Sequence, residues 1–163
     1  MLRLSLLALA AFATSSVAAD PRPYMKRGNP NELPLLVEAV GCPVDAAAVR
    51  AMAEGVVTRS RIKPLDPTTV EVPWAFPWLY VNVNCLEGGV VFRTDVDFLA
   101  VQGGDLVRFA LNGYGGFGVA AKDGVYILDE IKKRVEAAVT DYVKANLEPT
   151  VTPETPRRSN RAR

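Results

Sequence analysis

The chain contains 163 residues, with 19 basic side chains, 18 acidic side chains, no histidine and a formal net charge of +1. The lack of histidine excludes Ser-His-Asp catalysis, Cys-His catalysis and imidazole metal sites. A nearly neutral chain of this length suits one globular domain and lacks the positive surface that binds nucleic acid, so no nucleic-acid partner is expected.

The first 19 residues predict a secretory signal peptide. One arginine precedes an apolar run at Leu4–Phe12, and the small residues Val17–Ala19 form a cleavage site. The run is too short to cross a bilayer, so we expect an exported chain, periplasmic or secreted, with no transmembrane segment after cleavage. Retention of the uncleaved signal as an anchor is the alternative. Residues 20–32 contain three prolines and predict an extended leader.

A single domain is expected over residues 33–147, and it begins with a strand and a helix. The apolar run Leu33–Val40 predicts the strand. Asp45 is a favourable N-cap for a helix over 46–58, whose apolar residues recur at helical spacing. Gly55 within this helix indicates close packing against a sheet.

The clearest local pattern predicts a β-hairpin over residues 79–98. Gly88 and Gly89 suit a two-residue turn in which both residues have positive φ. A register shifted by one residue would place charged side chains among the valines, which favours the unshifted pairing. The expected pairs are Cys85–Phe92, Val83–Thr94, Val81–Val96 and Leu79–Phe98 on an apolar face, and Tyr80–Asp97, Asn82–Asp95 and Asn84–Arg93 on a solvent face.

The remaining elements complete a β-α-β-β-β-α order. We expect a third antiparallel strand over 106–111, a short strand near 119–121 and a long helix over 126–146, whose apolar stripe repeats at helical spacing. This order predicts an α/β (α+β) fold with two layers, in which two helices cover one face of a mostly antiparallel sheet of three to five strands. The arginine-rich and proline-rich residues 148–163 predict a disordered basic tail.

Cys42 and Cys85 are the two cysteines of the chain. In an oxidising compartment, such a pair predicts one structural disulfide. A redox-active pair is the alternative, but the cysteines do not form a Cys-x-x-Cys motif and no activating base lies beside either of them.

An aromatic residue stands at every second position from residue 74 to residue 80. Together with the polar side chains of the hairpin, this strip is typical of a sugar or peptide site, because rings stack while amides and carboxylates bind hydroxyls or amines. The alternatives are a core contact, which would include Phe76, or a homodimer contact. The candidate ligand-binding residues are Trp74, Trp78, Tyr80, Asn82, Asn84, Arg93, Asp95 and Asp97.

Asp95 and Asp97 invite two further interpretations. Paired acids can hydrolyse a glycoside or, with asparagine carbonyls, hold Ca²⁺. We favour a solvated pair neutralised by Arg93, and we assign no catalytic residue and no metal site. The glycines of Gly113-x-Gly115-x-x-Gly118 have the spacing of a dinucleotide-binding motif. In such a motif the helix begins within the glycine segment, whereas here the next helix is expected several residues later. We therefore expect these glycines to allow close backbone approach, and we expect no cofactor.

These observations predict an exported, non-catalytic binding or assembly module of a bacterial cell envelope that uses the solvent face of the 79–98 hairpin. Its expected partner is an envelope protein or polysaccharide. The alternative is an envelope polysaccharide hydrolase that uses Asp95 and Asp97, and a third hypothesis is a homodimer built on the aromatic strip.

Overall fold

The computed structural model describes residues 25–69, 77–86, 88–102, 105–109 and 114–147. The expected signal peptide, the basic tail, Trp74 and Phe76 lie outside these residues. The elements are β1 (Glu32–Val40), α2 (Ala46–Arg59), β2 (Lys63–Leu65), the 3-10 turn η1 (Pro67–Thr69), β3 (Trp78–Leu86), β4 (Val91–Gln102), β5 (Asp105–Phe109), β6 (Gly116–Val119) and α3 (Gly124–Leu147).

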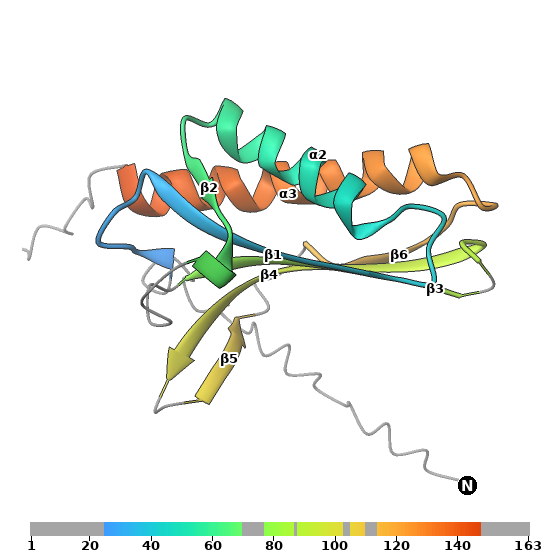
Figure 1. Ribbon diagram of the computed structural model, residues 1–163, viewed down its shortest axis with the longest axis horizontal. Coiled ribbons are helices and arrows are strands. Elements are labelled where there is room, and N and C mark those ends of the chain that lie inside the picture. Colours follow the sequence, from blue (N-terminus) through green and yellow to red (C-terminus); the bar gives the residue numbers. More distant parts are fainter. Residues whose placement is uncertain (1–24, 70–76, 87, 103–104, 110–113, 148–163) are drawn as a thin grey trace, which may run out of the picture.

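The two helices lie on one face of a single sheet, which confirms the two-layer α+β fold (Figure 1). The strand order is β2-β1-β3-β4-β5, and β6 also pairs with β4. The expectation of a mostly antiparallel sheet is corrected, because β1 runs parallel to both β2 and β3. Helix α2 lies between β1 and β2 in sequence, and such a crossover returns the chain in the same direction. With β2 and β6, the described residues contain six strands rather than three to five.

The register predicted for the hairpin is confirmed at every pair, from Leu79–Phe98 to Cys85–Phe92. The tip differs from a two-residue turn, because the last ladder pair is Leu86–Val91. The N–H of Gly89 donates to the carbonyl of Leu86 over 3.0 Å, and both tip glycines have positive φ. The hairpin tip is therefore wider than expected, while the alternation along both strands is retained.

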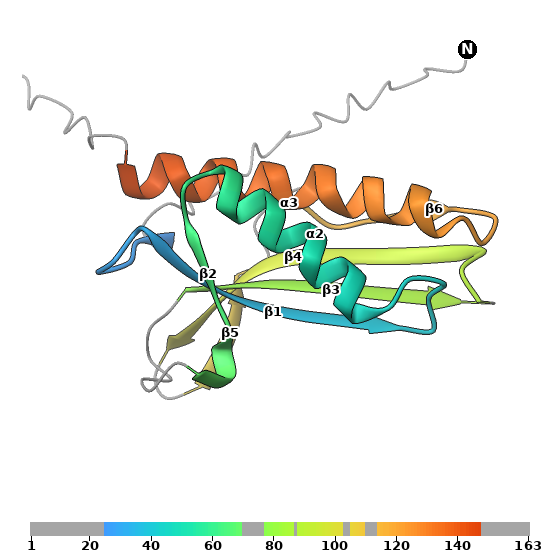
Figure 2. The same cartoon turned by 45° about the horizontal axis from the view of Figure 1, so that its top comes forward.

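The core lies between the sheet and the helices (Figure 2). Asp45 caps α2 as predicted, since its carboxylate accepts a hydrogen bond of 2.7 Å from the N–H of Ala48. The interpretation of Gly55 is wrong, because a Cβ there would meet only the guanidinium of Arg59 at 3.6 Å. Buried residues are Val49, Ala53, Val56 and Val57 in α2, and Ile127, Ile131, Val135, Ala138, Val139, Tyr142 and Ala145 in α3.

The predicted disulfide between Cys42 and Cys85 is present. It joins the turn after β1 to the end of β3, where the two parallel strands lie side by side. Gly41 has a φ of +67° at this junction, and a Cβ there would lie 2.8 Å from the carbonyl oxygen of Cys85. Only glycine fits both this backbone conformation and this close approach.

The described N-terminal residues are attached to the end of α3. Met25 is fully buried, and its carbonyl accepts a hydrogen bond of 2.9 Å from the side chain of Asn146. The side-chain amide oxygen of Asn146 accepts in turn a hydrogen bond of 3.0 Å from the backbone N–H of Arg27. The last residues of the expected leader therefore pack against the domain. None of the described helices is long and apolar enough to cross a membrane.

Candidate functional site on the open face of the sheet

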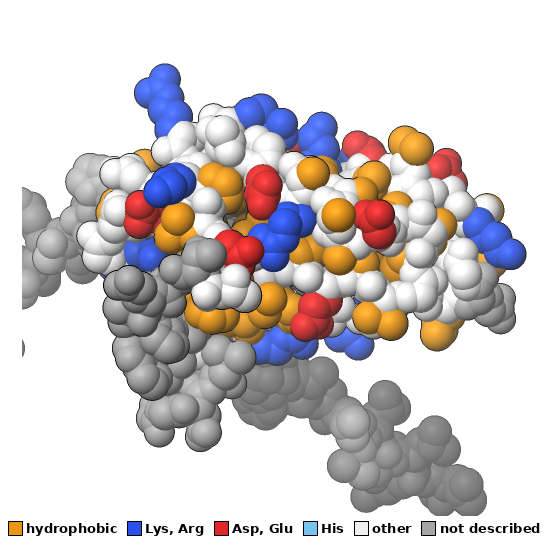
Figure 3. Space-filling view, viewed as in Figure 1, with side chains coloured by type: hydrophobic (Ala, Val, Ile, Leu, Met, Phe, Trp, Pro, Cys, Tyr) orange, Lys and Arg blue, Asp and Glu red, His pale blue; other side chains and the backbone are white. Residues whose placement is uncertain are grey.

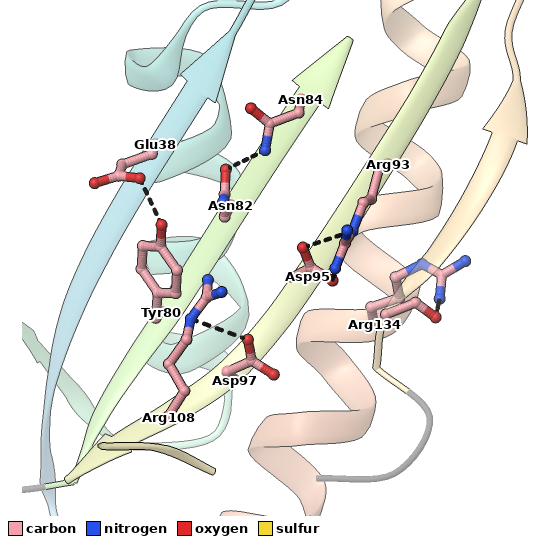
Figure 4. Close-up of polar contacts among 10 residues, drawn as sticks. Glu38, Tyr80, Asn82, Asn84, Arg93, Asp95, Asp97, Arg108 and Arg134 are labelled. Atoms are coloured by element: carbon pink, nitrogen blue, oxygen red, sulfur yellow. Dashed lines mark hydrogen bonds and ion pairs between the residues drawn. The ribbon is translucent and has the colours of Figure 1, made fainter. Parts of the chain in front are cut away.

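The face of the sheet opposite the helices carries most of the predicted site. Strand alternation places Tyr80, Asn82 and Asn84 of β3 on this face, opposite Asp97, Asp95 and Arg93 of β4 (Figure 4). Trp78 lies half-buried at the start of β3, and Trp74 lies outside the described residues. The structure thus places seven of the eight predicted residues, all but Trp74, on the surface that we call the open face.

Tyr80 is covered by two residues that sequence reasoning missed. Its ring lies 4.5 Å below the guanidinium of Arg108, and its hydroxyl donates a hydrogen bond of 2.5 Å to Glu38. Burial, this hydrogen bond and the charge of Glu38 raise the pKa of Tyr80 to about 12. An approaching ligand therefore meets the Arg108 guanidinium before the Tyr80 ring.

Arg108 could have been found from the sequence. The ladder pairs Gln102 with Asp105, and the same register places Arg108 opposite Leu99. Leu99 shares a face with Asp97, so Arg108 falls beside that carboxylate. The position of Glu38 follows only from the parallel pairing of β1 with β3, which the sequence did not predict.

Each aspartate on the open face has its own arginine. Arg93 lies 3.0 Å from Asp95 on the same strand, and Arg108 lies 3.6 Å from Asp97. Asp97 is 7 % exposed, and burial raises its pKa, an effect that the charge of Arg108 partly offsets. The charge of Asp95 also raises the pKa of Asp97. The expectation of a solvated pair neutralised by Arg93 is therefore corrected, because Asp97 is buried and pairs with Arg108.

The two asparagines interact with each other. The side-chain N–H of Asn84 donates to the side-chain carbonyl oxygen of Asn82 over 2.9 Å. The amide nitrogen of Asn82 and the amide oxygen of Asn84 are then directed away from the pair. Among the described residues, no group of three or more acidic or cysteine side chains is placed to hold a metal ion.

The glycine-rich segment has a packing role. A Cβ at Gly118 would lie 2.3 Å from the ring of Phe92, and a Cβ at Gly116 would lie 2.6 Å from the guanidinium of Arg134. Arg134 donates a hydrogen bond of 2.7 Å to the carbonyl of Gly115. Helix α3 begins only at Gly124, so its N-terminus lies beyond the motif. The prediction of close backbone approach is confirmed.

An exposed apolar strip crosses the open face at the hairpin end. It comprises Val40 of β1, Leu86 of β3, Val91 of β4, and Phe117 and Val119 of β6, with exposed fractions of 59, 68, 36, 80 and 72 %. The ladder pairs Leu86–Val91 and Val91–Val119 make it continuous across three strands. On the face of the molecule shown in Figure 3, by contrast, acidic and basic side chains are interspersed among apolar ones. Contiguous exposed apolar residues commonly mark an interaction surface.

Comparisons of the chain with protein-family models, with curated proteins and with solved structures found no match. The functional argument therefore rests on the geometry and chemistry of the open face.

Proposed function

We propose that the chain is exported and acts as a non-catalytic binding or assembly module of a bacterial cell envelope, with the open face of the sheet as its binding surface. The observation that carries the proposal is the composition of this face. Polar side chains of β3 and β4 lie next to an exposed apolar strip, and no helix among the described residues covers either set. A protein or polysaccharide contacts both kinds of group when it binds.

Two features support export. The Cys42–Cys85 disulfide suits an oxidising compartment. The first 19 residues have the charge, apolar run and small residues of a cleavable signal. Mass spectrometry of the protein recovered from the cell envelope tests this part, with Asp20 expected as the first residue. Recovery of the intact chain from the cytoplasm would overturn it.

The ion pairs that Asp95 and Asp97 form with arginines favour a binding role for this face over glycoside hydrolysis. A glycosidase needs one carboxyl group to protonate the leaving oxygen and a second to attack or activate water. Asp95 and Asp97 are each engaged by an arginine on an open sheet. These ion pairs hold both carboxylates in fixed positions, which suits the open face to the recognition of a ligand.

Affinity capture from an envelope extract tests the binding surface. The bait variant Asn82→Ala/Asp95→Ala removes two polar groups of the open face. The control variant Asp129→Ala/Glu136→Ala removes two exposed acids from α3. All three proteins are first shown to be folded by circular dichroism.

A polysaccharide or protein retained by the wild type and the control, and lost by the open-face variant, supports the proposal. Equal retention by the open-face variant, or none by the wild type, would overturn it. Release of reducing ends from envelope polysaccharide by the wild type, abolished in Asp95→Asn, would instead assign the hydrolase alternative.

A further inference from the structure

Strand β6 is an edge of the sheet whose chemistry differs from that of the other short strands. It pairs with β4 on one side, and no described strand lies on its other side. Edge strands are commonly protected by lysine, proline or other charged residues, because their unpaired backbone groups can accept another strand. Strand β2 carries Lys63 and Pro64, and β5 carries Asp105 and Arg108. Strand β6 contains only glycine, phenylalanine and valine.

The hydrogen-bond alternation shows which groups of β6 point away from β4. The N–H of Ala120 donates to the carbonyl of Val90 over 3.0 Å, so Ala120 directs its backbone groups toward β4. In an antiparallel ladder every second residue does the same, which assigns Gly118 and Gly116 to the β4 side. Phe117 and Val119 therefore direct their N–H and C=O groups outward.

The same two residues carry the most exposed side chains of the apolar strip. Phe117 is 80 % exposed and Val119 is 72 % exposed. Unpaired backbone groups and exposed apolar side chains thus coincide at two positions that flank Gly118. This arrangement is symmetric along the strand.

We propose that β6 pairs with β6 of a second copy of this chain, antiparallel and across a two-fold axis at Gly118. In that register Phe117 lies opposite Val119 of the second copy, and the outward N–H and C=O groups of both residues are satisfied. Each phenylalanine then packs on a valine directly across the strands. Strand β6 itself carries no charged side chain, while the Arg93 guanidinium lies 6.0 Å from the centre of the Phe117 ring and Arg134 donates to the carbonyl of Gly115.

A second copy fits this edge because the edge is complementary to itself. Outward groups, apolar side chains and the central glycine all match under the same two-fold rotation. The contact is small, since β6 has four residues, and stable interfaces bury about 1,200 Å² or more. The dimer is therefore weak and forms as the protein concentration rises. This inference uses Phe117 and Val119 of the apolar strip, which the proposed function also assigns to the binding surface. The capture experiment removes only polar groups of β3 and β4, so the two proposals can fail separately.

Sedimentation velocity over concentrations from about 1 µM to about 1 mM tests the dimer. The wild-type protein is expected to shift from monomer to dimer across this range. Val119→Lys introduces a charge at the edge, and Val119→Pro removes an outward N–H, so both variants should remain monomeric. The matched control is Val125→Lys, because Val125 is 77 % exposed but lies on α3.

Cross-linking tests the register. The variants Phe117→Cys and Val119→Cys are mixed under oxidising conditions, which keep Cys42 and Cys85 bonded. Opposed residues in the pair lie about 5.5 Å apart, within reach of a disulfide, whereas identical residues are too far apart. A cross-linked dimer is expected in the mixture and not in either variant alone.

Three results would overturn the proposal. The first is a wild type that stays monomeric over the whole range. The second is association of Val119→Lys to the same extent as Val125→Lys. The third is cross-linking of each cysteine variant by itself as efficiently as in the mixture.

Discussion

Removal of the Cys42–Cys85 disulfide is expected to destabilise the domain by about 4 kcal/mol. The bridge closes a loop with a sequence separation of 43, and the chain-entropy relation for that loop length gives this value at 25 °C. The closed loop contains α2 and β2 and ends on two neighbouring parallel strands. Without the bridge, the unfolded chain gains conformational freedom while the hydrogen bonds of the folded sheet remain.

The variant Cys42→Ala/Cys85→Ala measures this effect by thermal unfolding. For a domain of this size, a loss of about 4 kcal/mol corresponds to a fall in Tm of roughly 10–16 °C. Wild-type protein with the disulfide reduced serves as the control and should unfold near the same temperature as the variant. A variant that unfolds within about 3 °C of the oxidised wild type would refute the reasoning, because the disulfide would then not restrict the conformational freedom of the unfolded chain.

Three further substitutions test the packing and the electrostatics. Thr94→Val should stabilise the fold by about 1–2 kcal/mol in urea unfolding, because the buried Thr94 hydroxyl has no hydrogen-bond partner among the described residues; a loss of stability would contradict this. Gly55→Ala should stabilise α2 by about 0.5–1 kcal/mol, whereas Gly118→Ala should cost about 1–3 kcal/mol through its clash with Phe92, so equal Tm values for the two variants would refute the distinction. The pKa of Asp97 is raised in the folded state, so its contribution to stability is present below the unfolded pKa of about 3.9 and is lost as pH rises through the folded pKa. The quantity to compare is the urea midpoint of Asp97→Asn minus that of the wild type. This difference should be more positive at pH 7 than at pH 4, and a difference that does not change with pH would argue against a raised pKa.

Local features of the fold could be predicted from the sequence. The hairpin register follows from the alternation of apolar and polar side chains on both sides of Gly88 and Gly89. This pattern can be read from the sequence because the two strands follow one another along the chain. Asp45 identifies the start of α2 because an N-cap acts on the next few residues. The disulfide follows from the presence of only two cysteines.

The candidate site was only partly predictable. The alternation placed Asn82, Asn84 and Asp95 on one face, and the structure confirms that placement. The covering of Tyr80 by Glu38 and Arg108 was not predicted. These contacts join three strands, and the pairing of β1 with β3 depends on the path of the chain between them.

By itself, the sequence of this protein determined which side chains face inward along each strand and helix, because those choices depend on neighbours a few residues away. Only the tertiary structure decided that β1 lies parallel to β3 and that β6 has no described strand on its outer side. It also decided that a Cβ at Gly55 would meet no atom of the sheet within 4 Å, while Gly118 packs on Phe92. The physical reason is that long-range neighbours depend on how helices and strands pack together, and that packing leaves no periodic pattern in the sequence.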